Sequence, residues 1–372
     1  MPLKVLVVPD KFKGTLTAQE AAEAIARGWR KARPTDTLEL LPMSDGGDGF
    51  GEVFSRLLRA KAQTVKTVDA AHYPTRARWW WEPKSKTAII ESARVIGLAM
   101  LPPSKFHPFD LDTSGLGAVL QAAAKNGARH CLIGIGGSAT NDAGFGMARA
   151  LGWRFLDGQG AALERWTDLS SLSRIVPPES SAVKGMKIIV AVDVQNRLLG
   201  PRGASRVYGP QKGLRPQDFP LAERCLRRLA EVTTKHFHRD YSVLPGAGAA
   251  GGLGFGLFAF TGARARSGVE LFAGYAQLTR RLRGVDLVLT GEGALDKSTL
   301  MGKGVGEIAR LCRRPGIPCI GLAGILNDES LLKRRFTGVH CLAPEMTSPE
   351  RAKRRAAFWL GKLAAKVARG RG

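Results

Sequence analysis

Five loops of this 372-residue chain combine glycines or small polar residues with acids, and each follows an apolar run. The runs VLVVPD, LELLPM, CLIGIGG, IIVAVDV and VDLVLT lead into KFKGT, SDGGDG, SATNDAG, QNRLLGPRG and GEGALDKS. In open α/β sheets, ligands bind outside the carboxyl ends of the strands. Because all five loops follow strand-like runs, we expect them to form a ligand site at such an edge.

The loops supply carboxylates and cations together. The acids are Asp45, Asp48, Asp142, Asp193, Glu292 and Asp296, and the bases in or beside the loops are Lys11, Lys13, Arg202, Lys212 and Lys303. Glycine-rich turns and helix N-termini offer N–H groups to phosphate. A magnesium–nucleotide site needs carboxylates for the metal and cations for the transferring group. A hydride-transfer site needs few carboxylates near its pyrophosphate, so the acids favour phosphoryl transfer.

Glycine motifs alone leave the ligand open. Gly246, Gly248 and Gly251 spell G-x-G-x-x-G, and a similar pattern begins at Gly134. These matches support an alternative, an NAD(P)-dependent oxidoreductase of a small hydroxy acid, although close packing by small residues also explains the first. The segment GEGALDKS nearly matches a P-loop, but Asp296 replaces its second glycine and would repel phosphate, so we reject that assignment.

Composition narrows the class of protein. The five cysteines form no C-x-x-C pair, and the chain shows neither a signal peptide nor an apolar run of about 18 residues. We therefore expect a cytoplasmic protein without membrane contact. The net charge of +24 and the many bases after Glu345 suggest nucleic-acid binding as a third function. A terminal helix docked by its apolar face explains those bases better, so nucleic acid is the disfavoured partner.

The order of elements predicts an α/β fold. Residues 4–8 form a strand, and Thr17 with Glu20 predicts a capping box for the following helix. A second strand and helix follow, which indicates a doubly wound parallel sheet. Between about Lys61 and Glu91 three strands come in succession, and the strand–helix rhythm returns near the C-terminus. An inserted domain explains this change in rhythm.

Six stretches together resemble the bacterial glycerate kinases of the type I group. They are VVPDKFKGTLTA, LPMSDGGDG, GIGGSATNDAGFGMARALG, LLGPRGASRVYGPQKG, LPGAGAAGGLGFGL and LTGEGALDKSTLMGKG, in the order of the family. The chain departs from the family where Asn196-Arg197 replaces a frequent Asn-Pro pair and where ATNDAG replaces ATNDGG. Both changes are modest beside six long matches.

The resemblance implies ATP-dependent phosphorylation of D-glycerate with Mg²⁺, most simply at the 2-hydroxyl. It also implies a flavodoxin-like domain of residues 1–65 and 270–372 with an inserted domain, residues 66–269, resembling restriction endonucleases. The active site is expected in the cleft between these domains. The partners are then D-glycerate and ATP, and a homodimer is left open as the assembly.

Within this hypothesis each candidate residue receives a role. Asp193, Lys13 and Arg202 are the catalytic candidates: Asp193 is the base or orienting group, and the two cations steady the phosphoryl group or the substrate carboxylate. Asp45 and Glu292 are candidates for Mg²⁺, and Asp48, Asp142 and Asp296 join them as substrate or metal contacts. The nucleotide or phosphate candidates are Gly136, Gly137, Ser138, Thr140, Asn141, Lys212, Gly246, Gly248, Gly251 and Lys303. An aspartate that merely ties two loops together is the competing interpretation for each acid.

Overall fold

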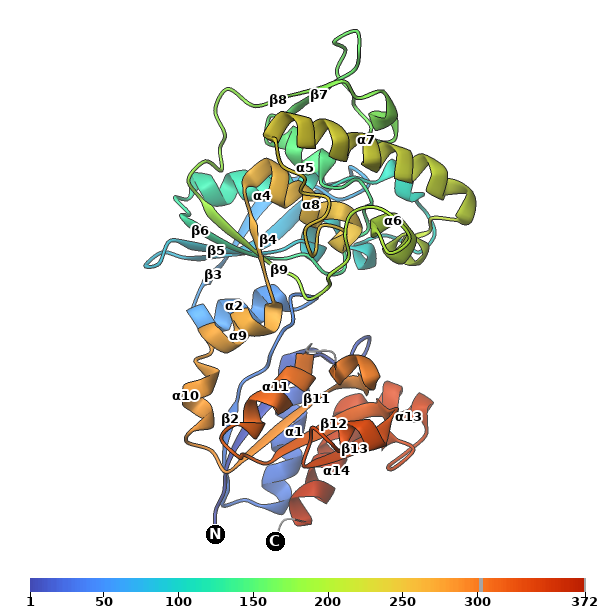
Figure 1. The fold of residues 1–372 in the computed structure, drawn as a ribbon. Helices are drawn as coiled ribbons and strands as arrows, with labels where there is room; N and C mark the ends of the chain where they lie inside the picture. Colours follow the sequence, from blue (N-terminus) through green and yellow to red (C-terminus); the bar gives the residue numbers. More distant parts are fainter. Residues whose placement is uncertain (301–303, 371–372) are drawn as a thin grey trace. The chain divides into compact units, whose positions relative to one another are not determined.

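The computed structural model describes residues 1–300 and 304–370 and contains two compact units (Figure 1). The first unit comprises Met1–Asp45 and Val269–Gly372, and the second comprises Gly46–Gly268. The second unit is therefore inserted into the sequence of the first, and both are α/β, which confirms the predicted fold class. Across the described ranges, no helix has the length and apolarity needed to cross a bilayer.

The first unit is built on a parallel sheet of five strands. The strands are β1 (Lys4–Pro9), β2 (Thr37–Leu40), β11 (Leu287–Leu295), β12 (Cys319–Leu326) and β13 (Gly338–Ala343), in the order β13-β12-β11-β1-β2. Every pair is parallel. Numbered within this unit the order is 2-1-3-4-5, the flavodoxin-like arrangement, whose topological switch point lies between β1 and β11.

Helices cover both faces of this sheet. The helices of this unit are α1 (Ala18–Ala32), α9 (Gly268–Tyr275), α10 (Leu278–Leu282), α11 (Gly304–Arg313), α12 (Glu329–Leu332), α13 (Pro349–Arg354) and α14 (Ala356–Arg369), of which α1, α13 and α14 pack on one face of the sheet and α11 on the other. On one face Ile320 packs with α1 and α14, whereas the adjacent Cys319 faces Cys312 of α11 on the other face. The capping box of Thr17 and Glu20 begins α1 as predicted.

The strand β11 is longer than its sequence suggests. We expected a loop at GEGALDKS, but β11 runs to Leu295, and its partner β12 runs to Leu326. Pairing of β11 with β1 ends at Gly291, whereas pairing with β12 continues to Leu295. Gly291 permits this because a Cβ there would lie 2.1 Å from the Leu322 carbonyl oxygen. The final segment of β11 therefore pairs on one side only, with β12, which itself stays paired with β13 as far as Ile325.

The inserted unit holds a mixed sheet of six strands. They are β3 (Lys61–Val68), β4 (Pro74–Glu82), β5 (Thr87–Glu91), β6 (His130–Gly134), β9 (Lys187–Ala191) and β10 (Arg264–Arg266), in the order β10-β9-β6-β5-β4-β3. The strands β3, β4 and β5 pair antiparallel, as the changed rhythm indicated, and the others pair parallel. A small hairpin of β7 (Arg154–Leu156) and β8 (Arg174–Val176) stands apart from this sheet.

The main core of the inserted unit lies on one face of its sheet. Its helices are α2 (Phe50–Leu58), α3 (Ala93–Ile96), α4 (Ser114–Lys125), α5 (Phe145–Ala150), α6 (Ala204–Tyr208), α7 (Phe219–Phe237) and α8 (Ala249–Thr261). Trp79 joins the large core that also contains side chains of α4, α5, α7 and α8. The next residue, Trp80, faces the other way and packs against Gly51 of α2.

The helix α2 explains where the units divide. The expected boundary followed residue 65, whereas the compact units divide after Asp45. The sequence shows α2 as part of a strand–helix rhythm that begins at the N-terminus. In the structure its Gly51 and Phe50 pack against Trp80 and Gly134 of the inserted sheet, which places the helix in that unit. The domain assignment itself stays a prediction.

Candidate functional site

Two acids of the first unit meet at the switch point of its sheet. Pro9 of β1 is paired with Gly291 of β11, and Asp10 and Glu292 are the next residues of the two strands. The Asp10 N–H donates to the Gly291 carbonyl at 2.8 Å, which fixes Asp10 against β11. With Asp45 and Asp296 these residues form what we call the carboxylate cluster, because each affects the charge of another.

The carboxylate cluster is electrostatically strained. Burial, and then the charges of Asp45 and Glu292, raise the pKa of Asp10 to about 8, against the opposing effect of Lys11. Burial also raises the pKa of Glu292 to about 7, and repulsion from Asp45 and Asp296 adds to the shift. Two acids that resist ionisation near neutral pH are typical of sites that receive a cation or move a proton.

Few local groups offset this charge. The Thr299 hydroxyl donates to Glu292 Oε1 at 3.2 Å, and the same hydroxyl accepts from the Asp296 N–H at 3.2 Å. The Lys11 N–H donates to Asp10 Oδ1 at 2.7 Å, and the Lys11 side chain partly offsets the charge of both buried acids. Asp296 therefore shapes the turn that carries Thr299 and also adds negative charge.

The donor chemistry of the carboxylate cluster fits Mg²⁺ that arrives with phosphate. Mg²⁺ prefers oxygen ligands and is commonly held by one or two carboxylates with substrate phosphates and water completing the shell. Asp45 and Glu292 offer such oxygens and repel each other without a cation. Within the described ranges, no three His, Cys, Asp or Glu side chains are arranged to hold a metal by themselves.

In the inserted unit the carboxyl ends of neighbouring parallel strands align. Glu91 of β5, Gly134 of β6 and Ala191 of β9 are register partners across the sheet. Asp193 follows β9 by two residues, and its Oδ1 accepts the Gly268 N–H at 3.1 Å. Asp193 is half-buried and lies at the strand edge that the sequence predicted.

Two glycine loops pack together at this edge. The Gly136 N–H donates to the Gly46 carbonyl at 3.3 Å, and a Cβ on Gly136 would lie 2.7 Å from Gly47 Cα. A Cβ on Gly137, whose φ is +78°, would lie 2.4 Å from Asp48 Oδ1. The loop SDGGDG thus contributes Asp45 to the carboxylate cluster and its next three residues to this second group.

Glu91 holds the second half of that loop in place. Its two carboxylate oxygens accept the N–H groups of Gly49 at 3.0 Å and Gly51 at 2.9 Å, at the start of α2. The side chain is buried, and Arg94 lies 3.5 Å from one oxygen. A carboxylate at a helix N-terminus is stabilising, so Glu91 acts as a positioning residue for the loop.

A third group, which we call the buried polar cluster, comprises Ser138, Thr140, Asn141, Asp142 and Lys212. Their side chains are at most 6% exposed. Ser138 and Thr140 hydroxyls lie 3.0 Å apart, the Asn141 amide donates to the Ser205 hydroxyl at 3.0 Å, and Lys212 Nζ donates to the Thr140 carbonyl at 2.5 Å. Burial lowers the pKa of Lys212 to about 7, and Asp142 partly opposes this.

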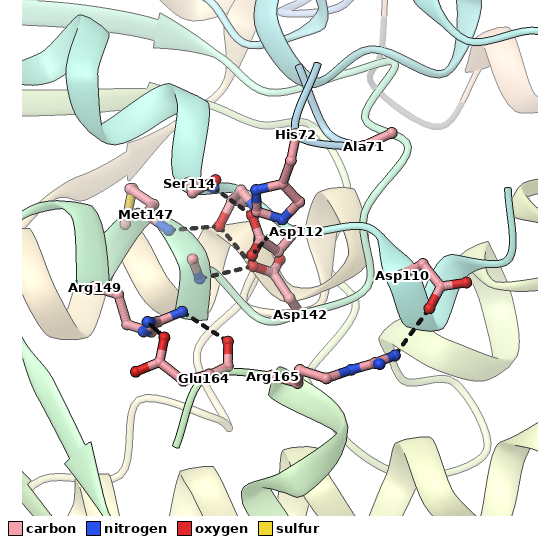
Figure 2. Close-up of polar contacts among 12 residues, drawn as sticks. Ala71, His72, Asp110, Asp112, Ser114, Asp142, Met147, Arg149, Glu164 and Arg165 are labelled. Carbon is pink, nitrogen blue, oxygen red and sulfur yellow. Dashed lines mark hydrogen bonds and ion pairs between the residues drawn. The ribbon is translucent and has the colours of Figure 1, made fainter. Parts of the chain in front are cut away.

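Asp142 is the centre of a closed network (Figure 2). Its Oδ2 accepts from the Thr113 N–H at 2.9 Å, the Thr113 hydroxyl at 2.7 Å and the Gly146 N–H at 2.9 Å, while Oδ1 accepts from the Gly144 N–H at 3.3 Å. Burial and then Asp112 raise its pKa to about 6. Asp112 in turn pairs with His72 at 3.2 Å. The observed contacts make Asp142 a brace, and a substrate contact for it stays a prediction.

The glycines of the G-x-G-x-x-G stretch pack against protein. No strand precedes Gly246 among the described residues 241–245, so the context of a dinucleotide turn is missing. A Cβ on Gly248 would lie 2.2 Å from the Arg197 carbonyl oxygen, and one on Gly251 would lie 1.9 Å from that of Thr140. These glycines permit close packing of α8 on neighbouring loops. Phosphate contacts for them stay predictions.

The remaining candidates are exposed or undescribed. Lys13, Asp48 and Arg202 are exposed, and the Arg202 carbonyl accepts from the Asn196 amide at 2.8 Å. Lys303 lies outside the described residues. Exposure leaves the Lys13 and Arg202 charges accessible to a ligand, and their catalytic roles stay predictions.

Sequence reasoning missed Asp10 and Glu91. Asp10 directly follows a buried strand, which is the same signal that selected Asp193. In that loop only the cations Lys11 and Lys13 were taken as candidates. Glu91 ends β5, whose following segment lacks glycines, so no loop motif marked it. A search for an acid at the end of every predicted strand, whatever its direction, would find both.

Comparison with known proteins gives one consistent result. The sequence matches the glycerate kinase family over residues 5–371. It is 34% identical to the glycerate kinase of Halalkalibacterium halodurans, over 98% of this chain and 97% of that protein. It is 36% identical to the glycerate 2-kinase of Escherichia coli, over 88% and 86%. A crystal structure assigned as glycerate kinase 2 of Salmonella typhimurium LT2 superposes with a TM-score of 0.83 at 34% identity, covering 99% of this chain and 98% of that one.

Proposed function

The chain belongs to the glycerate kinase family, and we propose that it transfers the γ-phosphoryl group of ATP to the 2-hydroxyl of D-glycerate. Family membership makes the protein a kinase. The donor nucleotide, the accepting hydroxyl and the metal are the parts that this proposal adds.

The observation that carries the proposal is the carboxylate cluster at the switch point of the first sheet. Asp10, Asp45 and Glu292 bring three carboxyl groups together where open α/β sheets bind ligands, so that ionisation of all three concentrates negative charge there. Such charge repels a bare phosphate or a carboxylate substrate. It becomes favourable when a divalent cation accompanies the nucleotide, which is the form in which kinases use ATP.

Asp45 and Glu292 would hold Mg²⁺, and the bound ion would neutralise negative charge on the phosphate oxygens. Asp10 lies beside these residues and contributes to their field without needing to ligate. Lys11 partly balances the cluster. These side chains thus prepare a position that favours a cation-bound nucleotide over a free organic acid.

The inserted unit provides groups suited to the acceptor and the phosphates. Asp193 is held through Oδ1 by the Gly268 N–H, and we assign it to orient the glycerate 2-hydroxyl and accept its proton. Arg202, and Lys13 of the first unit, are exposed cations that would steady the phosphoryl group or the glycerate carboxylate.

Phosphorus NMR of the product tests both the reaction and its site. Purified protein is incubated with ATP, MgCl₂ and D-glycerate, and ADP release is followed in parallel. A phosphate on carbon 2 couples to one proton and gives a doublet, whereas one on carbon 3 couples to two and gives a triplet. We expect the doublet. D-Lactate, which keeps the 2-hydroxyl, should be the better of two truncated acceptors, and 3-hydroxypropionate should not react.

The outcomes separate the parts of the proposal. A triplet would contradict the assignment of the hydroxyl but keep the kinase. ADP release that is independent of glycerate, with no new phosphorus signal, would contradict the activity. Reduction of NAD by a hydroxy acid in place of phosphorylation would favour the oxidoreductase alternative.

A further inference from the structure

A cavity of about 490 Å³ opens in the inserted unit beside the first residues of α4 and α5. Its wall includes Ser114, Arg149, Trp153, Arg154, Leu163 and Glu164. None of the lining residues belongs to the candidate catalytic, metal or phosphate sets. A volume of this size lies within the range of small-molecule sites, roughly 300–1,000 Å³.

One side of the cavity has an unused hydrogen-bonding group. The hydroxyl of Ser114, the first residue of α4, is buried and has no hydrogen-bond partner among the described residues. Its backbone N–H is already taken by Asp112 Oδ1 at 2.8 Å. A buried hydroxyl without a partner costs free energy, and rotation of the Ser114 side chain toward the cavity would let a ligand oxygen satisfy it.

The charged groups of the wall leave a net positive charge. Arg149 is paired with Glu164 through its guanidinium and also donates to the Glu164 carbonyl at 2.7 Å (Figure 2). Arg154 at the start of β7 makes no ion pair with any residue that the structure describes. Two arginines against one glutamate give one positive charge, and Arg154 is the group positioned to meet an anion.

The remaining wall is apolar and partly aromatic. Trp153 lines the cavity, and its ring packs edge-on against Phe237 with centroids 5.6 Å apart and in a tilted arrangement against Phe260 at 5.3 Å. Phe155 and Leu163 are buried beside it. A rigid aromatic wall favours a flat apolar group over a fully polar metabolite.

We propose that this cavity is an accessory binding site for a small organic anion with a flat apolar body. The anion faces Arg154, its oxygen meets the Ser114 hydroxyl, and its apolar part lies along Trp153 and Leu163. The wall is joined to the buried polar cluster because the Gly146 N–H, at the cavity, donates to Asp142. Occupancy therefore acts on the same segment that carries Ser138, Thr140 and Asn141.

Binding of 2-naphthoate to the full chain, measured by isothermal titration calorimetry, tests the site. We expect saturable binding at one site per chain, and at least tenfold weaker binding of the neutral analogue 2-naphthalenemethanol. Arg154→Gln and Ser114→Ala should each weaken naphthoate binding about tenfold, equivalent to about 1.4 kcal/mol. Ser114→Ala should leave the melting temperature unchanged, because the removed hydroxyl has no partner to lose.

A blocking variant keeps the test decisive. Ala162 is exposed at the cavity rim, so Ala162→Trp should fill the cavity without disturbing the core, and it should abolish naphthoate binding while kinase turnover persists. Arg174→Gln, an exposed arginine of β8 outside the cavity, is the matched control and should bind normally. Absence of naphthoate binding in the native chain, equal binding of the neutral analogue, or full binding by Ala162→Trp would each overturn the proposal.

Discussion

In the carboxylate cluster of the first unit, Asp10 and Glu292 face other acids, whereas in the inserted unit Asp142 faces hydrogen-bond donors. Repulsion adds to burial in raising the pKa of Asp10 to about 8 and of Glu292 to about 7. Asp142 is buried at least as completely as Asp10, yet its pKa rises to about 6 rather than 8, because donors from Thr113 and Gly146 stabilise its charge against the effects of burial and Asp112. Similar acids in similar loops thus meet opposite surroundings.

The difference separates two uses of a strand-end acid. A carboxylate whose oxygens accept hydrogen bonds from backbone N–H groups fixes the shape of a loop, and these hydrogen bonds stabilise the folded protein. A carboxylate held against other carboxylates stores unfavourable energy that only a ligand or a proton relieves. On this criterion we predict that Asp142 serves the architecture and Glu292 the chemistry.

Glu292→Gln should show the largest effect, and it tests whether Glu292 serves catalysis rather than loop structure. Removing one cation-binding charge should lower kcat/KM by about 10²–10³-fold. The melting temperature should stay level or rise, because repulsion from Asp45 and Asp296 is removed. Steady-state kinetics and thermal unfolding measure the two quantities. Glu329→Gln, which changes an exposed acid paired with Lys333, is the control and should alter neither. A destabilised but fully active Glu292→Gln would reverse the assignment.

Asp142→Asn should have the opposite pattern. The amide places an N–H₂ group among donors that now meet a carboxylate, so we expect a loss of about 2–3 kcal/mol in the free energy of unfolding. Urea denaturation measures it. Asp110→Asn removes only an exposed pair with Arg165 and should cost at most about 0.5 kcal/mol. Equal stability of the two variants would show that the network does not brace the loop.

The pH dependence of stability tests the buried polar cluster through the Lys212 ammonium. Burial lowers its pKa to about 7 from an ordinary 10.5, so the folded state binds this proton less tightly than the unfolded state does. Its contribution to stability is complete above pH 10.5 and is lost as the pH falls through 7. Between pH 7 and 9 this group should therefore add about 1–2 kcal/mol to the free energy of unfolding. Lys212→Met should remove that gain, and urea titrations at both pH values measure the difference.

A persisting gain in the Lys212→Met variant would assign the effect to another group. Lys235→Met, at an exposed position of α7, is the matched control and should keep the native pH dependence.

Arg202→Gln should produce the smallest change and tests whether an exposed cation near the inserted loops binds substrate. We expect KM for glycerate to rise about 3–10-fold with kcat nearly unchanged, the pattern of an interaction made equally in the ground and transition states. Arg224→Gln, an exposed arginine of α7, should leave KM unaltered. A fall in kcat with constant KM would instead place Arg202 at the reacting phosphoryl group.

The sequence predicts local structure well where one interaction decides it. The capping box at Thr17, the buried strand of β1 and the succession of strands β3–β5 all follow from short patterns, and the structure confirms them. The basic terminal helix docks as expected, but the chain breaks it at Arg355 into α13 and α14. These features need only near neighbours in the chain.

What the sequence cannot predict are properties set by distant partners. The burial of Asp142 depends on Thr113, and the close packing of Gly251 depends on Thr140, neither of which a local pattern reveals. Extension of β11 to Leu295 likewise depends on β12, which continues beside it. The glycines that we predicted as phosphate contacts, such as Gly248 and Gly251, instead pack closely against the backbone of neighbouring loops. The spacing of residues predicts where a loop lies, but it does not predict the direction in which the N–H groups and side chains of that loop point.

The interrupted sequence of the first unit has a consequence for biosynthesis. The helix α1 buries Ile25 and Trp29 against a core completed by β11 and α14, yet it leaves the ribosome before the whole of the inserted unit. At about 5–20 residues per second, roughly 10–50 seconds of translation separate α1 from β11. Throughout that interval only β1 and β2 are available to cover the apolar face of α1, while Gly46–Gly268 already forms a continuous folding unit. The helix α1 is therefore synthesised early but is among the last elements to complete its packing.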